Sequence, residues 1–156
     1  MHLTLQSDYC LRVLIALGVA PDRRGTIGSI AAQYDISRNH LMKVCHRLQQ
    51  LGYIEGIRGK GGGLRLAREP AEIRIGEVLR AMEPHFELVE CFGEDSRCAI
   101  TRACRLQGML AAALVEFFRV LDGHTLAELL TPGPRLAGLL AVPAPVPRAR
   151  RALRQP

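Results

Sequence analysis

Residues 35–51, which read DISRNHLMKVCHRLQQL, decide the fold. Ser37 can cap the start of a helix over residues 38–51, and Gly52 can end it. At about 100° per residue, the apolar side chains of this helix gather on one face, formed by Leu41, Val44, Cys45, Leu48 and Leu51. Residues 27–34 predict a short helix before it, and residues 35–37 form a tight turn. Two short helices joined in this way are typical of a helix-turn-helix.

The opposite face of the predicted helix over residues 38–51 is polar and partly basic. It presents Asn39, Lys43, His46 and Gln50, with Arg38, His40 and Arg47 on its flanks. Side chains of these kinds reach base edges and phosphates in a DNA groove. An ordinary amphipathic surface helix would also be polar outside, so this face needs support from the rest of the chain.

A glycine-rich hairpin is predicted directly after this helix. Residues 53–58 and 64–67 are typical of two short strands, and residues 59–63 between them read GKGGG. Arg58, Lys60 and Arg65 place positive charge at the tip. A basic hairpin in this position predicts the wing of a winged helix, with a flexible glycine hairpin as the alternative. The spacing excludes a phosphate-binding P-loop, because Gly61 stands where that motif has Ser or Thr.

The charge of the chain is concentrated in this region and in the C-terminal tail. The net charge is +6, and residues 38–68 hold seven Lys or Arg side chains against one acid, Glu55. A local basic block on an otherwise balanced domain suggests a polyanion partner, and the alternative is a solvated face. On either side of this block, residues 6–19 predict a helix capped by Ser7 or Asp8, and residues 75–82 a short helix closed by Pro84.

Three of the five cysteines fall in one polar, charged segment. Cys91, Cys98 and Cys104 are displayed there, whereas Cys10 and Cys45 lie inside apolar helical patterns, where a free cysteine behaves as a small hydrophobe. Thiolates select zinc, copper(I) or iron-sulfur clusters. The segment has neither a zinc CxxC pair nor a ferredoxin run, so the spacing leaves the metal open, with unliganded regulatory thiols as the alternative.

A long helix is predicted over residues 102–122, with Thr101 as its cap. Its apolar side chains recur at alternating spacings of four and three, which is typical of a helix-helix seam: Leu106, Leu110, Ala113, Phe117 and Val120. One small domain can cover only part of this surface. We therefore expect a two-fold dimer built on this helix, with an intramolecular core helix as the alternative. Gly123 ends the helix, and Thr125 caps a short turn to Leu130.

The tail and the cysteine usage indicate the setting of the protein. Residues 132–156 contain six prolines, five arginines and no acid, which predicts disorder. The odd cysteine count, the lack of a signal-peptide pattern and the lack of an apolar run of roughly 18 residues indicate a reducing, cytoplasmic compartment and no membrane span.

Motifs in five places, taken in order, resemble the NsrR type of the Rrf-two family over about residues 1–131. They read SDYxLR from Ser7, SRNHLxK from Ser37, RGKGGGxRL from Arg58, EC from Glu90 with CxITxACRL from Cys98, and DGxTLA from Asp122. Members of this family are dimeric winged-helix transcription factors that hold an iron-sulfur cluster. In this branch they repress nitric oxide detoxification genes until nitric oxide destroys or nitrosylates the cluster.

The resemblance implies a role for each matching residue. Cys91, Cys98 and Cys104 would be the cluster thiolates, and Asp8 matches the carboxylate from the partner subunit's first helix that completes the coordination. Without the resemblance, Asp8 is a first-turn acid that favours the helix dipole. A 4Fe–4S cluster is favoured and a 2Fe–2S cluster is the alternative.

We therefore predict a mainly α fold with a winged helix-turn-helix domain, a cysteine loop and a long dimerisation helix. The expected units are a DNA-binding domain at 1–84, a cluster-binding loop and dimerisation helix at 85–131, and a Pro/Arg-rich tail at 132–156. The function expected is that of a non-enzymatic homodimeric repressor, bound to a pseudo-palindromic operator in double-stranded DNA and released by nitric oxide. The DNA contacts would come from Ser37, Arg38, Asn39, His40, Lys43, Arg47, Arg58, Lys60 and Arg65.

Two kinds of alternative share parts of this pattern. A winged-helix regulator of iron-sulfur assembly, or a redox sensor that uses bare thiols or zinc, would have the same fold. A small iron-sulfur electron carrier or enzyme belongs to another class, and the basic helix-turn-helix with its wing argues against it.

Overall fold

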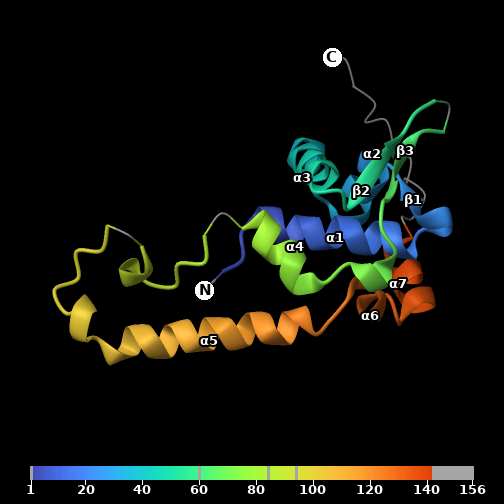
Figure 1. Cartoon of the computed structure of the whole chain (residues 1–156). Helices are drawn as coiled ribbons and strands as arrows, with labels where there is room; N and C mark the ends of the chain where they lie inside the picture. The colour runs from blue at the N-terminus through green and yellow to red at the C-terminus, as the bar shows by residue number, and fades with distance from the viewer. Residues whose placement is uncertain (1, 60, 84, 94, 142–156) are drawn as a thin grey trace, which may run out of the picture.

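The computed structural model describes residues 2–141 apart from residues 60, 84 and 94. Its helices are α1 (Leu5–Val19), α2 (Ile27–Tyr34), α3 (Arg38–Gln50), α4 (Ile75–Met82), α5 (Arg105–Asp122), α6 (Leu126–Leu129) and α7 (Gly133–Leu140). Its strands are β1 (Arg24–Gly25), β2 (Ile54–Ile57) and β3 (Gly63–Leu66). The predicted fold class is confirmed, with α1 to α4 and the sheet in one body from which α5 projects (Figure 1).

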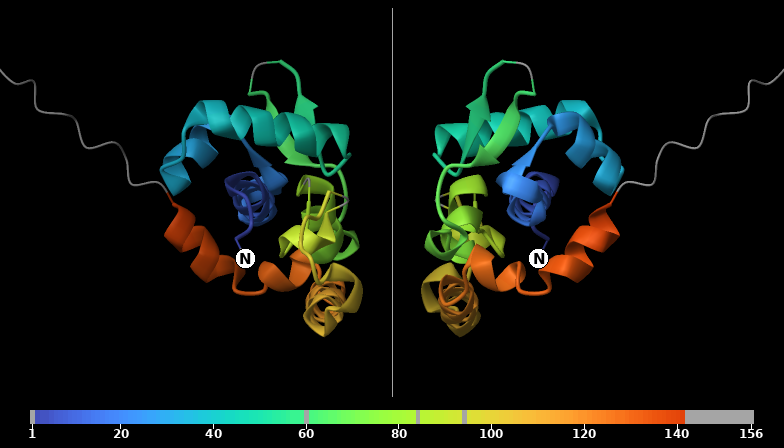
Figure 2. Two further views of the ribbon diagram at one scale, coloured as in Figure 1. Left: turned by 90° about the vertical axis from the view of Figure 1, so that its left-hand side faces the viewer. Right: turned by 90° about the vertical axis from the view of Figure 1, so that its right-hand side faces the viewer.

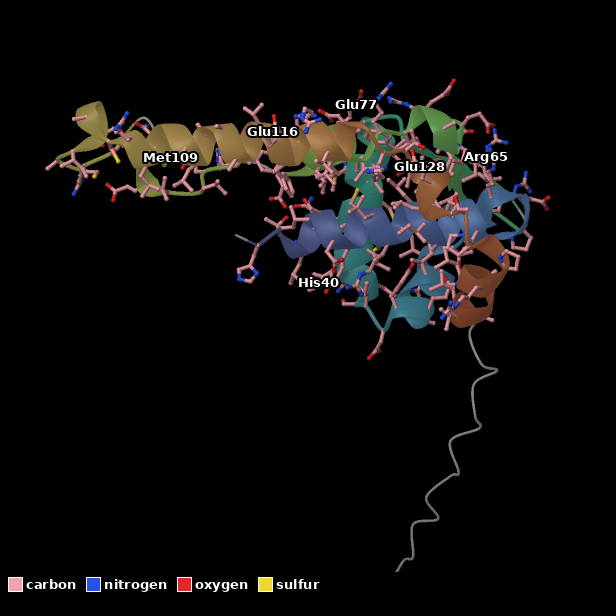
Figure 3. The ribbon with its side chains drawn as sticks, turned by 90° about the horizontal axis from the view of Figure 1, so that it is seen from below. His40, Arg65, Glu77, Met109, Glu116 and Glu128 are labelled. Atoms are coloured by element: carbon pink, nitrogen blue, oxygen red, sulfur yellow. The ribbon has the colours of Figure 1, made fainter. Side chains whose placement is uncertain are left out.

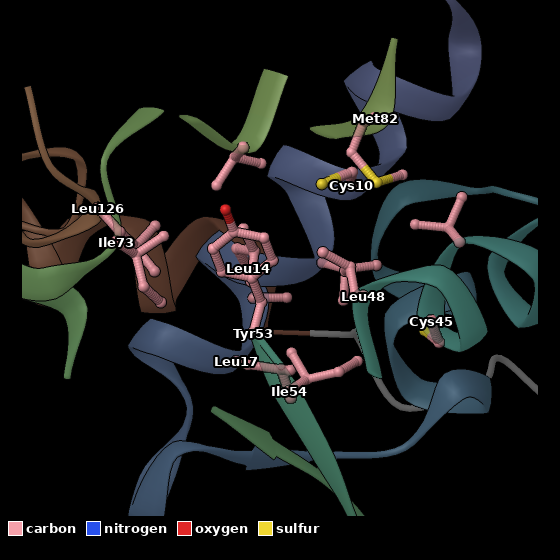
Figure 4. Close-up of a cluster of buried hydrophobic side chains, with 14 of the residues drawn as sticks. Cys10, Leu14, Leu17, Cys45, Leu48, Tyr53, Ile54, Ile73, Met82 and Leu126 are labelled. Atoms are coloured by element: carbon pink, nitrogen blue, oxygen red, sulfur yellow. The ribbon is translucent and has the colours of Figure 1, made fainter. Parts of the chain in front are cut away.

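Helix α1 is the element around which the others pack. Figure 2 looks along it and shows α3 on one side and the C-terminal helices on the opposite side. Val13, Leu14 and Leu17 of α1 are wholly buried, because one face of the helix meets α3 and β3 while another meets α4 and α6. Figure 4 shows Leu14 and Leu17 among side chains of the same core, including Leu48, Tyr53, Ile54, Ile73, Met82 and Leu126.

The start of α1 differs from the prediction. Thr4 is the cap, since its hydroxyl oxygen accepts a hydrogen bond from the Ser7 amide at 3.3 Å. Ser7 is buried inside the first turn, so the prediction that Ser7 or Asp8 caps the helix is wrong. The Thr4 amide also donates to Glu83 Oε1 at 2.7 Å, which ties the start of α1 to the end of α4.

The helix-turn-helix forms where it was predicted. Helix α2 begins with a capping box, in which the Thr26 and Ser29 side chains each accept from the other's amide at 3.0 Å. It ends at Asp35, whose φ of 53° turns the chain sharply toward α3. Ser37 occupies the cap position of α3, as expected, but its side chain makes no cap hydrogen bond.

The wing contains one strand more than was predicted. The strand order is β1-β3-β2, all antiparallel, with Gly25 opposite Leu64 and Gly56 also opposite Leu64 on the other side. A Cβ on Gly63 would lie 2.5 Å from the Gly25 carbonyl oxygen, so β1 can approach β3 only because position 63 is glycine. At the tip, Gly59 and Gly61 have φ values of 96° and 81°, which favour glycine.

Helices α4 and α5 are joined by a polar cluster around Asp122. Arg80 donates two hydrogen bonds of 2.6 Å to its carboxylate, and Arg74 donates to its carbonyl oxygen at 2.8 Å. Gly76 lies against the same carboxylate, where a Cβ would clash. Beside this cluster, the Phe86 ring packs edge-on against Phe118 with centroids 4.6 Å apart.

The chain after residue 100 differs from the prediction at two points. Helix α5 begins at Arg105 with Cys104 at its cap position, and Thr101 instead starts a separate 3-10 turn over Thr101–Ala103. The prediction of disorder from residue 132 is wrong for Gly133–Leu140, because these residues form α7, which packs against α1. The rest of that tail, residues 142–156, lies outside the described residues. No helix in the described part of the chain has the length and apolarity that a membrane span requires.

Candidate metal centre and nucleic-acid interface

Helix α3 presents the predicted polar face to solvent. Leu41, Val44, Cys45 and Leu48 are buried, and Leu51, just past the end of the helix, is half-buried against the core, so the predicted inner face is confirmed. The side chains proposed to read DNA from α3 and its cap position are all exposed: Ser37, Arg38, Asn39, His40, Lys43 and Arg47. The first turn of α3 has no acidic residue, so no side chain there neutralises the charge of Arg38.

Contacts within the chain separate Arg47 from the other side chains of this face. Arg47 Nη2 donates to the carbonyl oxygen of Ala81 at 3.3 Å, which links α3 to the end of α4. His40 lies at the other end of the helix, with its ring centroid 6.3 Å from that of Tyr9 on α1. The sequence could not reveal either contact, because the partners are more than thirty residues away along the chain.

One of the basic side chains predicted for the wing is paired with an acid inside the sheet. Arg58 is exposed beside the tip, whereas Arg65 is paired with Glu55 across β2 and β3 at 2.6 Å. Lys60 lies outside the described residues. The added strand β1 brings Arg24 opposite Arg65, so a basic side chain absent from the prediction joins this sheet. Nothing in the sequence near Arg24 indicated a strand, because β1 is only two residues long.

The three clustered cysteines lie on the segment that connects α4 to α5. Cys91 is in a 3-10 turn over Glu90–Phe92, and Cys104 stands at the cap position of α5. Both are half-buried, Cys98 between them is exposed, and all three are free thiols. Within the described residues, no group of three or more Cys, His, Asp or Glu side chains is placed to hold a metal ion, so the structure does not gather the three thiols.

Hydrogen bonds hold the backbone of this cysteine loop at three points. Gln107 Nε2 of α5 donates to the Cys91 carbonyl oxygen at 2.7 Å. The Thr101 hydroxyl donates to the Cys98 carbonyl oxygen at 2.8 Å. The Arg97 amide donates to Glu90 Oε1 at 2.9 Å. None of these three bonds involves a thiol, so the thiols remain available for a ligand.

The two remaining cysteines have a different environment. Burial, together with a smaller effect of Cys45, raises the pKa of Cys10 to about 12. Burial raises the pKa of Cys45 to about 11. A thiol must lose its proton to ligate a metal or attack an electrophile, so neither group is available at neutral pH. The predicted division between displayed and core cysteines is therefore confirmed.

This division predicts a labelling pattern. Iodoacetamide added to the native, cluster-free protein at pH 8 should modify Cys91, Cys98 and Cys104 at least about tenfold faster than Cys10 and Cys45, because burial shields the latter two from the reagent and raises the pKa of their thiols. Peptide mass spectrometry after timed quenching measures each rate. In urea all five cysteines should react, and native labelling of Cys10 at the rate of Cys98 would contradict the burial described above.

Asp8, the proposed ligand from the partner subunit, lies in the first turn of α1. Its carboxylate pairs with Arg12, with Oδ2 2.7 Å from Nη2 and Oδ1 3.1 Å from Nε. The side chain is 41% exposed, so it is accessible from outside. In the described part of one chain, Asp8 and the cysteines form no common ligand group.

Helix α5 leaves a long apolar surface uncovered. Phe118 is its only buried residue, while Leu106, Met109, Val115 and Val120 are each more than half exposed. Figure 3 shows Met109 on the part of α5 that projects away from α1. A groove of about 660 Å³ also lies along the helix, and Val115 lines it together with Arg80, Phe92, Ala111, Phe118 and Asp122 among others. The alternative of an intramolecular core helix is therefore wrong for most of α5.

Comparisons with known proteins place this arrangement in a family. Residues 3–132 match the model of Rrf2, described as an iron-dependent transcriptional regulator. The HTH-type transcriptional regulator NsrR of Geobacillus kaustophilus is 49% identical over 142 residues, covering 90% of this chain and 97% of the relative. NsrR of Bacillus subtilis is 49% identical over 132 residues, covering 83% of this chain and 90% of the relative.

Solved structures agree in fold. T. potens IscR superposes with a TM-score of 0.69 at 22% identity, covering 85% of this chain and 88% of the other, which is a likeness of fold alone. CymR, the global cysteine regulator of B. subtilis, has a TM-score of 0.65 at 26% identity, covering 85% and 98% of the two chains.

Proposed function

Because this chain belongs to the Rrf2 family and is an NsrR-type transcriptional regulator, not an enzyme, we propose that it is a homodimeric repressor whose operator affinity depends on an iron-sulfur cluster. Nitric oxide is the signal that lowers this affinity. The observation that carries the proposal is the cysteine loop, which displays three free thiols beside the projecting helix of a winged-helix protein.

The DNA-reading head consists of α3 and the wing. Arg38, Asn39, His40 and Lys43 reach base edges and phosphates from the exposed start of α3, since the first residues of a recognition helix enter the major groove. Arg58 of the wing contacts the flanking backbone or minor groove, together with Lys60. Arg65 is paired with Glu55, so it contributes to phosphates only by leaving that carboxylate. Arg47 donates one hydrogen bond to the Ala81 carbonyl oxygen and keeps its charge and its other N–H groups for phosphates.

The dimer forms through the uncovered apolar side of α5. An exposed apolar surface of this length is unusual on a monomer, and burying it against a second copy removes it from water. A two-fold pair of α5 helices sets two reading heads at a fixed separation, which suits a pseudo-palindromic operator. In this organisation residues 1–84 bind DNA and residues 85–131 provide the loop and the dimer helix.

The donor chemistry of the loop fits an iron-sulfur cluster. Cys91, Cys98 and Cys104 would hold it, because thiolates are the usual ligands of such clusters and none of the three is committed elsewhere. The partner subunit's Asp8 would supply the remaining ligand, because its side chain is 41% exposed and its carboxylate could exchange Arg12 for iron. When bound, the cluster supplies iron that reacts with nitric oxide. A carboxylate is a poor match for such a soft site, so Asp8 is the ligand most easily lost.

Contacts of α1 connect this ligand to the reading head. Tyr9 follows Asp8 directly, and its ring lies beside His40 at the start of α3. Arg12, which holds Asp8 when no iron does, has its guanidinium 5.9 Å from the Tyr9 ring and 5.6 Å from the Tyr34 ring of α2. Through these contacts, loss of Asp8 as a ligand would shift α1 relative to both helices of the helix-turn-helix and so would change the spacing of the two heads.

The proposal is tested by purifying the protein without oxygen. We expect a brown protein with iron and sulfide in equal amounts, tight binding to its operator in gel shifts, and loss of both colour and binding on addition of nitric oxide. Operator affinity that is unchanged after the colour is lost would contradict cluster-gated repression. A colourless protein that contains zinc, or no metal, would instead support the thiol or zinc sensor.

A further inference from the structure

The outer face of α3 carries one apolar side chain that the fold does not use. Met42 is 50% exposed, and it is the only large apolar residue of α3 that is exposed. Among the described residues, it belongs neither to the buried core nor to the partly buried side chains that pack against it. Single exposed apolar residues are common on protein surfaces, so the position of Met42 on the helix must decide what it means.

That position lies among the side chains proposed to read DNA. Asn39 is three residues before Met42 and His46 four residues after it, so both are its neighbours on the helix surface. Asn39, Lys43 and His46 are exposed, and Leu41 and Val44 on either side along the chain are buried. Met42 is thus part of the outer face, in the half of α3 that comes first in the chain and would enter the groove.

The major groove offers one apolar group to a side chain in this position. Adenine, guanine and cytosine present hydrogen-bond donors and acceptors there, whereas thymine also presents a 5-methyl group. Methionine is flexible and polarisable, so it can follow a methyl group whose position varies slightly. Every other exposed side chain of α3 is polar and would contact donors, acceptors or phosphates.

We propose that Met42 packs against the 5-methyl group of a thymine at one position in each operator half-site and selects thymine there. The inference rests on the proposed binding of α3 in the major groove, and it adds a base preference that no hydrogen bond supplies. Removing one buried methyl group corresponds to about a fourfold loss of affinity for each half-site, and about fifteenfold when both half-sites lose it.

The test uses duplexes in which single thymines are replaced by deoxyuridine, which lacks only the methyl group. An operator is first selected from random duplexes with the cluster-loaded protein under anaerobic conditions, and each thymine is then replaced in turn. We expect one position in each half-site where the replacement weakens binding about fourfold. Met42→Ala should bind the thymine and deoxyuridine duplexes equally at that position, and Met42→Leu should retain the preference.

Lys43→Ala is the matched control, because it removes a charged neighbour on the same face. It should lower the affinity for both duplexes and leave the ratio of the two affinities unchanged. The inference is overturned if wild type shows no preference at any thymine, or if Met42→Ala keeps the wild-type preference. It is also overturned if Met42→Ala lowers the affinity for the thymine and deoxyuridine duplexes by the same factor. Dissociation of the Met42→Ala dimer in sedimentation would overturn it as well. A wild-type protein that selects no duplex at all would instead defeat the proposed function.

Discussion

Replacing Cys98 with alanine should give a colourless protein that binds its operator about 5 to 150 times more weakly than wild type, the usual range for coupling between two sites. Cys98 is the most exposed of the three loop cysteines and has no role in the core. Its backbone carbonyl accepts from Thr101, and alanine keeps that bond. The loss therefore comes from the missing thiolate and not from a rearranged loop.

Anaerobic absorbance, an iron and sulfide count, and gel shifts measure this prediction. Cys10→Ala is the matched control, since it also removes one thiol but from the core of α1, where burial keeps the group protonated. The control should remain brown and keep its operator affinity. A Cys98→Ala protein that is colourless yet binds as tightly as wild type would show that the loop does not govern DNA binding.

Met109→Glu should convert the dimer into a monomer. Met109 is 67% exposed on the projecting part of α5, where the proposed partner would cover it (Figure 3). An unpaired charge buried in an apolar interface costs about 3 to 5 kcal/mol, which raises the dimer dissociation constant by a factor of about 150 to 5,000. Because a monomer lacks the partner subunit's Asp8, the variant should also hold its cluster weakly.

Sedimentation at several protein concentrations measures the dissociation constant. Leu139→Glu provides a matched control, because Leu139 is 74% exposed but lies on α7, away from the α5 surface. That variant should stay dimeric and brown. If Met109→Glu stays dimeric as well, the uncovered side of α5 is not the subunit interface.

Several elements could be predicted because their causes lie within a few residues of each other. The buried face of α3 follows from apolar residues at helical spacing, and α2 and α4 have the predicted ends. The hairpin of the wing follows from glycines whose positive φ values other residues avoid. The sequence also predicted which cysteines lie in the core and which do not, because the polarity of neighbouring residues indicates whether a segment faces water.

Other features could not be predicted, because they depend on residues far apart in the chain. Strand β1 exists only through its pairing with β3, about forty residues later, and Arg47 meets Ala81 only after α4 has packed. Thr4 replaces Ser7 as the cap of α1 because Ser7 is drawn into the interior. Helix α7 forms in a stretch rich in proline and arginine because α1 offers it a surface to pack against.

The sequence by itself determined a winged helix-turn-helix with a basic reading face, a long apolar helix and three displayed thiols. The tertiary structure decided which of these groups are free to act. It paired Arg65 with Glu55, tied Arg47 to the Ala81 carbonyl oxygen by one hydrogen bond, and left Met42 and most of the apolar side of α5 uncovered. The physical reason is that spacing along the chain sets which face of a helix or strand a side chain occupies. Which side chains on that face stay exposed for a partner depends on how distant elements pack against it.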